Sequence, residues 1–111
     1  AALRLRFEVF NLELLEGLES SYITERDEDR FDAICHHLLV LERETGAVIG
    51  TYRLQTLEMA QSAANFYCSE EFRLEQLPPE ILSGALEIGR ACITLNHRNS
   101  RVLFLLWKGL A

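Results

Sequence analysis

The chain has 111 residues, of which 49% are apolar and 25% are charged, and its formal net charge is -6. This length suits one domain, and this composition is typical of a folded globular chain rather than a disordered one. The acidic charge argues against a nucleic-acid surface, and the longest apolar run near the end, VLFLLW, is far shorter than the ~20 residues of a bilayer span. Because the chain begins without Met and ends inside an apolar helical pattern, we expect it to be a piece of a longer protein.

Helical periodicity opens the chain. The apolar residues Leu3, Phe7, Phe10, Leu14 and Leu18 recur at intervals of three and four, which predicts one amphipathic helix over about 2–15, ended near Gly17. The polar stretch SSYITERDEDR at 20–30 then predicts a loop with a short helical turn.

Three strand-like segments follow. The segments 33–42 and 47–56 flank RETG, whose Gly46 suits a turn, so they predict an antiparallel hairpin. A helical turn is expected around 60–67, and Pro78-Pro79 should break any element there. The segment 85–93, ALEIGRACI, predicts a third strand with enough apolar residues for burial on both faces, and a last helix should begin near Ser100. This order predicts an α/β or α+β fold with helices on a largely antiparallel sheet.

All three aspartates of the chain lie in one short stretch, RDEDRFD at 26–32. A D-x-D pattern begins many calcium loops, but Phe31 stands at the third ligand position and no Gly follows, so we predict no metal site. The alternative is a solvated run of charges in which Asp27 caps a helical turn.

Charged residues inside the predicted strands favour a different interpretation. Arg53 lies in the second strand, and Glu87 and Arg90 lie in the third. A charge buried in a strand costs several kcal/mol unless it is paired. Asp29 and Asp32 are candidate partners, and Arg6 on the first helix could also reach inward. We therefore expect an ionic cluster that is either structural or orients a charged substrate.

The cysteines and histidines give weaker signals. Since the cysteines are odd in number and widely spaced, we expect free thiols in a reducing compartment. They are Cys35, Cys68 and Cys92. His36 and His37 should point to opposite faces of a strand, which disfavours a shared metal or a catalytic role, and we expect His97 at the surface.

The turn HRNS at 97–100 joins the third strand to the last helix. Backbone N–H groups and the helix dipole favour an anion at such a position, and two arginines add positive charge. A phosphate or pyrophosphate could bind there through Arg98, Asn99, Ser100 and Arg101. The alternative is a simple Ser100 N-cap beside exposed arginines.

Several segments together resemble the ornithine N-acyltransferase family of ornithine-lipid synthesis. These segments are RDEDRFDAICHHLLV, VIGTYRLQT, NFYCSEEFRL, and LEIGRACI with HRNSRVLFLLWKGLA. Such proteins, often called hemolysin-like, belong to the GNAT acyltransferase superfamily. The resemblance covers nearly the whole chain and implies one partial GNAT-like domain over 1–111, in which a mostly antiparallel sheet is flanked by helices.

A more distant resemblance is to the acyl-homoserine-lactone synthases. Their Arg before Val-Phe matches Arg6, Val9 and Phe10, and their acidic-x-Asp-x-aromatic-Asp pattern matches Asp27, Asp29, Phe31 and Asp32. Their strand Arg matches Arg53, and their Glu-x-x-Arg matches Glu87 and Arg90. Glu16 stands where that family carries a tryptophan, which argues against a lactone synthase and its adenosylmethionine substrate.

The first resemblance implies an enzyme that moves a fatty acyl or 3-hydroxyacyl group from acyl carrier protein to the α-amine of ornithine or a similar amino acid. The donor would be the acyl-phosphopantetheine of acyl carrier protein, or acyl-CoA, with no tightly bound cofactor and no metal. The implied location is cytoplasmic, and a peripheral position at the inner membrane stays open. A lactone synthase and a non-catalytic module that binds the acyl carrier are the alternatives.

The resemblance also implies roles for individual residues. Glu87 would act as general base, and a backbone N–H near Ala91 or Cys92, in a bulge of the strand 86–93, would polarise the thioester carbonyl. The acidic loop would be positioned by ion pairs and leave a carboxylate for the cationic amino acid. The groups concerned are Asp29, Asp32, Arg53, Arg90 and Arg6. Phe10 and Phe31 would contact substrate, the loop 96–101 would hold the pantetheine phosphate, and a Cys92 nucleophile is the less favoured alternative.

Overall fold

A three-stranded antiparallel sheet forms the centre of the computed structural model, which describes residues 1–63 and 65–111. The strands are β1 (His36–Leu41), β2 (Val48–Thr56) and β3 (Leu86–Ile93), in the spatial order β1-β2-β3. The predicted α+β class and the three predicted strands are confirmed. The first strand begins later than expected, since residues 33–35 form a turn.

The hairpin between β1 and β2 follows the local turn chemistry. Gly46 has a φ of 72°, a left-handed conformation that glycine adopts without a Cβ clash. Its N–H donates to the Glu42 carbonyl at 2.9 Å, and the Glu42 N–H donates to the Ala47 carbonyl at 2.8 Å. The predicted turn at Gly46 is confirmed.

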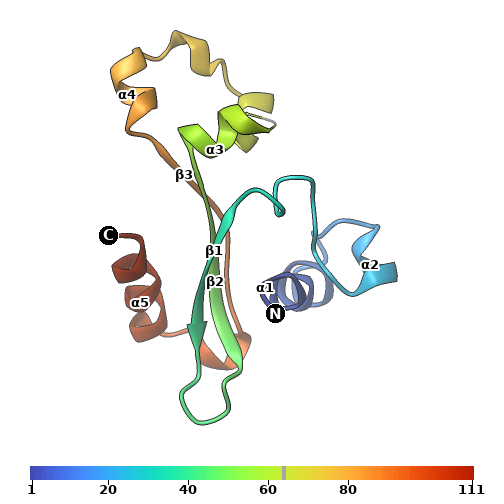
Figure 1. Ribbon diagram of the computed structural model, residues 1–111. Coiled ribbons are helices and arrows are strands. Elements are labelled where there is room, and N and C mark those ends of the chain that lie inside the picture. The colour runs from blue at the N-terminus through green and yellow to red at the C-terminus, as the bar shows by residue number, and fades with distance from the viewer. Residues whose placement is uncertain (64) are drawn as a thin grey trace.

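Helices cover both faces of the sheet (Figure 1). Helix α5 (Ser100–Leu110) packs on one face through its buried Val102 and Leu106. A Cβ at Gly50 of β2 would lie 3.3 Å from Val102, so the glycine lets the helix approach closely. Helix α1 (Ala2–Arg6) packs on the opposite face of the sheet.

The first helix changes its winding after one turn. A π-helical segment, Phe7–Glu13, continues α1, and the Leu14 N–H donates to the Val9 carbonyl five residues back. The helix then ends in a left-handed Leu15 with a φ of 58°. Leu14 and Leu18 were predicted to continue the buried face, but their side chains are 47% and 37% exposed, so that prediction is wrong. The wider π-helical turns rotate the buried face, and the helix stops at Glu13.

Short helices connect β2 to β3 at one end of the sheet (Figure 1). They are α3 (Leu57–Ser62), the 3-10 turns Tyr67–Glu70 and Leu74–Gln76, and α4 (Pro79–Ser83). The predicted helical turn at 60–67 overlaps α3, and its residue 64 lies outside the described residues. The proline pair begins a helix rather than only breaking one, because Pro79 occupies the first helical position, where no N–H is required. In the part of the chain that the structure describes, no helix is both long and apolar enough to cross a bilayer.

Strand β3 is not buried on both faces, contrary to the sequence-based expectation. Leu86 and Ile88 are 44% and 39% exposed, whereas Cys92 is buried. Among the described strands β3 pairs with β2 alone, so one of its edges is open and its apolar side chains are only half covered. This open edge borders the cavity described below.

Candidate active site

One face of the central strand is lined by polar side chains that are almost inaccessible to water. Thr51, Arg53 and Gln55 alternate along β2 and are 1%, 5% and 2% exposed. A buried polar face is tolerated only where its groups are hydrogen-bonded. Arg53 pairs with the acidic loop 27–32. The Thr51 hydroxyl donates to the Leu38 carbonyl, and the Gln55 amide donates to the Asn65 carbonyl.

Arg6 holds the acidic loop from the first helix. Its Nε donates to Asp27 at 2.7 Å, and its Nη1 and Nη2 donate to the two carboxylate oxygens of Asp32 at 2.6 and 3.2 Å. All three residues are less than 9% exposed. This fork geometry is the one in which a guanidinium pairs most strongly with carboxylate. The predicted inward reach of Arg6 is confirmed.

Arg53 joins the same network from the sheet. Its Nη1 donates to Asp29 at 2.7 Å and to Asp32 at 3.0 Å. The loop is further tightened by its own backbone, because the Phe31 N–H donates to Asp29 at 2.9 Å and the Asp29 N–H donates to Asp32 at 2.7 Å. The short aspartate side chain brings its carboxylate back to the main chain two or three residues away, which a glutamate would overshoot.

The Asp32 carboxyl shows the electrostatic result. Burial raises its pKa, but hydrogen bonds from the Arg6 guanidinium and from the Asp29 N–H lower it more, so the pKa falls to about 2. The same contacts raise the pKa values of Arg6 and Arg53 against the opposing effect of burial. Asp32, Arg6 and Arg53 are therefore ionised at neutral pH.

Arg90 approaches this network without joining it fully. Its Nε lies 3.8 Å from Asp27, and its Nη2 lies 3.9 Å from Asp29, both beyond hydrogen-bond distance. The guanidinium also lies over the ring of Phe10, 5.5 Å from its centroid. Because its side chain is 23% exposed, Arg90 retains donors for a further partner.

Arg90 also occupies a bulge in the sheet. Thr51 pairs with Cys92 and Arg53 pairs with Gly89, so β3 contains one residue more than β2 between these pairs. Arg90 has a φ of 49°, a left-handed conformation that costs an ordinary residue roughly 1–2 kcal/mol. The bulge that the family resemblance implied for this strand is confirmed.

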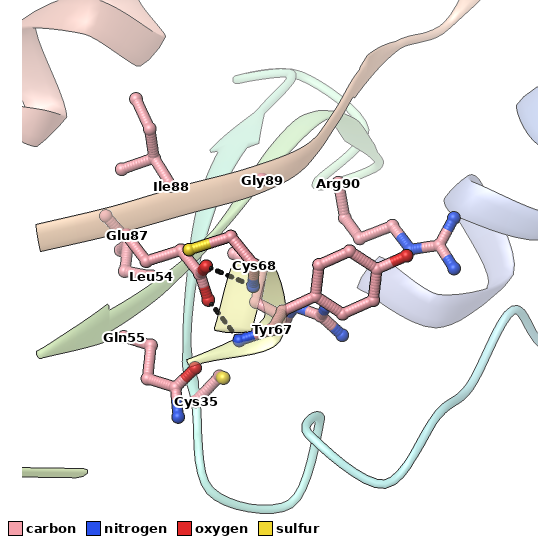
Figure 2. Close-up of a pocket in the computed structure, with 10 residues that line it drawn as sticks. Cys35, Leu54, Gln55, Tyr67, Cys68, Glu87, Ile88, Gly89 and Arg90 are labelled. Carbon is pink, nitrogen blue, oxygen red and sulfur yellow. Dashed lines mark hydrogen bonds between the residues drawn. The ribbon is translucent and has the colours of Figure 1, made fainter. Parts of the chain in front are cut away.

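Glu87 has a different set of partners from the one expected. Its two carboxylate oxygens accept hydrogen bonds from the backbone N–H groups of Tyr67 and Cys68, each at 2.8 Å (Figure 2). The carboxylate thus caps the 3-10 turn Tyr67–Glu70 and ties it to β3. No ion pair links Glu87 to an arginine within residues 1–63 and 65–111.

A cavity of about 260 Å³ lies between these groups. Arg53, Glu87 and Arg90 line it from the sheet, and Tyr67 and Cys68 line it from the capped turn (Figure 2). Three further residues line this cavity without a site role having been predicted for them from the sequence: Tyr67, Cys68 and Gln55. The only signal for them in the sequence was that Glu87, a charged residue in a predicted strand, needed a hydrogen-bond or ion-pair partner that the sequence did not identify.

The two aromatic residues expected to contact substrate pack against neighbouring side chains. Phe31 is 3% exposed and meets the ring of Tyr67 edge-on, with centroids 5.5 Å apart, while the Arg53 guanidinium lies 5.7 Å from the Phe31 centroid. Phe10 packs against the buried cluster of Leu5, Val9 and Cys92. Neither phenylalanine lines the cavity.

The cysteines are free thiols, as expected, and none is activated. Burial raises the pKa of Cys92 to about 12 and that of Cys68 to about 11, and it also raises the pKa of Cys35. Cys92 is also 7% exposed, which disfavours it as a nucleophile.

The turn before α5 has its own local partners. Arg98 forms a two-pronged ion pair with Glu13 and donates from Nε to the Ile93 carbonyl, and Asn99 caps the helix by accepting from the Val102 N–H at 3.1 Å. The cap is therefore Asn99 and not Ser100. Ser100 and Arg101 are exposed and remain open to an anion.

His97 is partly buried rather than simply at the surface. Its ring nitrogens lie 3.0 Å from the Thr94 hydroxyl and 3.2 Å from a Glu42 carboxylate oxygen. The side chain therefore links the turn before α5 to the β1–β2 hairpin.

Of the six buried side-chain polar atoms in the described chain that have no hydrogen-bond partner, three are oxygens of residues in the ionic network or beside the cavity. They are Asp27 Oδ1, Asp29 Oδ2 and Gln55 Oε1. Native proteins rarely leave such atoms unpaired, so each calls for a donor that the chain does not supply. Unpaired carboxylate and amide oxygens suit a ligand with ammonium or amino N–H donors.

A family comparison agrees with this geometry. The model of the acetyltransferase (GNAT) domain matches residues 5–108. The chain belongs to this family. The bulged β3 and the α5 that follows it are therefore elements of a GNAT domain.

Curated relatives are similar over most of this chain. An L-ornithine N(alpha)-acyltransferase of Brucella abortus is 39% identical over 98% of this chain, and one of Agrobacterium fabrum is 34% identical over 98%. An L-ornithine N(alpha)-acyltransferase of Rhizobium meliloti is 38% identical over 76% of this chain. The chain spans 41%, 40% and 30% of the lengths of the Brucella, Agrobacterium and Rhizobium proteins. No solved structure matches significantly.

Arg6 and Arg90, which both face the acidic loop, should differ sharply in their effect on stability. Arg6→Met removes the hydrogen-bonded partner of buried carboxylates and should lower the free energy of unfolding by roughly 3–5 kcal/mol. Arg90 makes no such hydrogen bonds to a carboxylate, and Arg90→Met leaves its left-handed backbone unchanged. This substitution should therefore lower the free energy of unfolding by about 1 kcal/mol or less. Urea denaturation of both variants measures the difference, and equal midpoint shifts would contradict the assignment of Arg6 as the principal partner.

The depressed pKa of Asp32 predicts a pH dependence. The folded carboxyl titrates at about 2 rather than 3.8, so its stabilising effect is complete above about pH 5 and is lost as the pH falls toward 2. The loss should reach about 2 kcal/mol. Because the chain has only three aspartates, ¹³C-aspartate labelling should resolve their carboxyl signals, and one should titrate near pH 2. If all three aspartate carboxyls titrated at the midpoint pH of an ordinary aspartate, the ionic network would be refuted.

Proposed function

We propose that this chain forms part of an enzyme that transfers a fatty acyl or 3-hydroxyacyl group from acyl carrier protein to the α-amine of ornithine or a similar amino acid. Membership of the GNAT family and the names of the three relatives support this proposal. The observation that carries it is a buried ionic network with unpaired carboxylate oxygens, placed beside a bulged strand and an open cavity.

The charged groups in and beside the cavity suit an acceptor that carries both positive and negative charge. Three guanidinium groups face three loop carboxylates, and the carboxylate of Glu87 adds one further negative charge. The unpaired Asp29 Oδ2 would receive the side-chain ammonium of ornithine. Arg90, which has donors to spare, would bind the acceptor's α-carboxylate. This pairing holds the acceptor by both ends and leaves its α-amine for reaction.

The bulge supplies the means to activate the acyl donor. A bulge leaves backbone groups outside the regular ladder of hydrogen bonds. The N–H of Ala91 or Cys92 would donate to the thioester oxygen as negative charge develops there. The α-amine then attacks the carbonyl carbon, a C–N bond forms and the C–S bond breaks. The carrier leaves as its thiolate, which is then protonated by way of Glu87 after that carboxylate has accepted the proton that the amine loses.

Direct attack by the amine requires no acyl-enzyme. The Cys92 thiol is buried and protonated at neutral pH, so it is a poor nucleophile. The proton of the α-amine would pass to Glu87, directly or through a water, using lone pairs that the amide hydrogen bonds leave free.

The donor would be held as a substrate, with no tightly bound cofactor. The exposed Ser100 and Arg101, at the start of α5, would bind the single phosphate of phosphopantetheine. Acyl-CoA is the alternative donor. The reaction would take place in the cytoplasm or at the inner membrane surface, where an acylated amino acid enters lipid synthesis.

A thiol-release assay tests the proposal. Full-length protein with 3-hydroxyacyl carrier protein should release free carrier thiol when ornithine is added, and neutral norvaline, which lacks the side-chain amine, should be a much poorer acceptor. A requirement for S-adenosylmethionine would indicate a lactone synthase instead. Binding of acyl carrier protein without turnover, for any amino acid, would indicate a non-catalytic module.

Glu87→Gln separates a base from a structural cap. As a base, Glu87 should be required for turnover, and its loss should reduce kcat by about 10²-fold and remove the acid limb of the pH–rate profile. Cys68→Pro serves as the control, because it removes one N–H donor to the Glu87 carboxylate and leaves that carboxylate in place. If Glu87→Gln keeps the acid limb of the pH–rate profile and lowers kcat no more than Cys68→Pro does, then Glu87 only caps the turn and is not the base.

A further inference from the structure

An apolar groove runs along the open edge of β3, beside the charged cavity. Its volume is about 360 Å³. The walls come from the segment between β2 and β3, with Phe66, Leu77 and Leu82, and from β3 itself, with Leu86 and Ile88. Leu77, Leu86 and Ile88 remain 39–44% exposed, so these side chains are available to a ligand.

A second hollow extends this groove. It has a volume of about 260 Å³ and shares Phe66, Leu74 and Leu82 with the groove. Leu57 and Ala60 of α3 form its far wall. Polar side chains also line this second hollow, so the apolar surface that it adds to the groove is limited to Leu57 and Ala60. These polar residues are Gln61, Asn65, Ser69 and Glu75.

The groove is also continuous with the charged cavity. Cys68, Glu87 and Ile88 line both spaces. Glu87 is the only charged residue among the groove's lining residues in the described chain, and it lies at the shared end. Polarity thus falls along the path from Arg90 and Glu87 toward Leu77 and Leu82, which suits a ligand with a reactive polar end and an apolar tail.

We propose that the fatty acyl chain of the donor lies in this groove, with its carbonyl at the bulge of β3 and its terminal methylenes against Leu77 and Leu82. This inference rests on the proposed acyl transfer and adds the position of the chain. The segment between β2 and β3 then sets the acyl length, and Glu87 fixes one wall through its hydrogen bonds to the Tyr67–Glu70 turn.

Equilibrium binding of fatty acids tests this position independently of turnover. Octanoate, dodecanoate and hexadecanoate compete with a fluorescent fatty acid for the full chain. Affinity should rise by about fourfold for each methylene buried, the equivalent of ~0.8 kcal/mol. Leu77→Trp fills the groove and should weaken hexadecanoate by about tenfold or more while changing octanoate little.

Ile81→Trp is the matched control. Ile81 lies on α4, is 57% exposed and lines neither hollow, so the same substitution should leave the length dependence unchanged. Leu86→Trp provides a second groove variant on β3, and far-UV circular dichroism verifies folding. Equal length profiles in wild type, Leu77→Trp and Leu86→Trp would overturn the proposal.

The transfer assay distinguishes the two proposals. Turnover with an unchanged preference for acyl length in Leu77→Trp would overturn the groove and leave acyl transfer intact. Chain-length-dependent binding that Leu77→Trp abolishes, without turnover for any acceptor, would refute the proposed transfer and support the groove as an acyl-binding site.

Discussion

The buried pairing of two arginines with the acidic loop is the interaction on which the site depends. Arg6 and Arg53 come from different layers, and both donate to Asp32. Charged side chains this deeply buried destabilise the fold unless each is paired with an opposite charge, because an unpaired buried charge carries a desolvation cost of several kcal/mol. The network therefore ties the first helix, the loop and the central strand into one unit. A cavity wall made in this way has a fixed charge pattern before any ligand arrives.

Strand β3 adds an irregular stretch of backbone to this rigid unit. Its bulge places Arg90 in a left-handed conformation and removes backbone groups from the regular ladder. Strain of this kind persists only where the surroundings enforce it, and it is concentrated at functional sites. Three residues earlier, Glu87 captures the turn 67–70 and brings Tyr67 over Phe31 and Arg53. The bulge at Arg90 and the turn capped by Glu87 thus both line the same cavity.

Alternation along β3 also explains why a charged cavity and an apolar groove adjoin each other. Glu87 pairs with Gln55 on the polar face, while Leu86 and Ile88 project from the opposite face at an open edge. A ligand that passes around this edge meets both surfaces within a few residues. GNAT family membership and this local arrangement together make an acyl chain with a polar reacting end a coherent ligand.

Local chemistry determined much of this protein from sequence alone: strand alternation, the Gly46 turn, and the need of buried strand charges for opposite charges nearby. Tertiary structure decided the rest, for physical reasons that local patterns do not carry. Burial of β3 depends on how many neighbours a strand has, not on its own apolar residues. The winding of the first helix ended its apolar face before Leu14. The partner of Glu87 lies 19 and 20 residues away along the chain, so only the folded path of the intervening helices brings those N–H groups to its carboxylate.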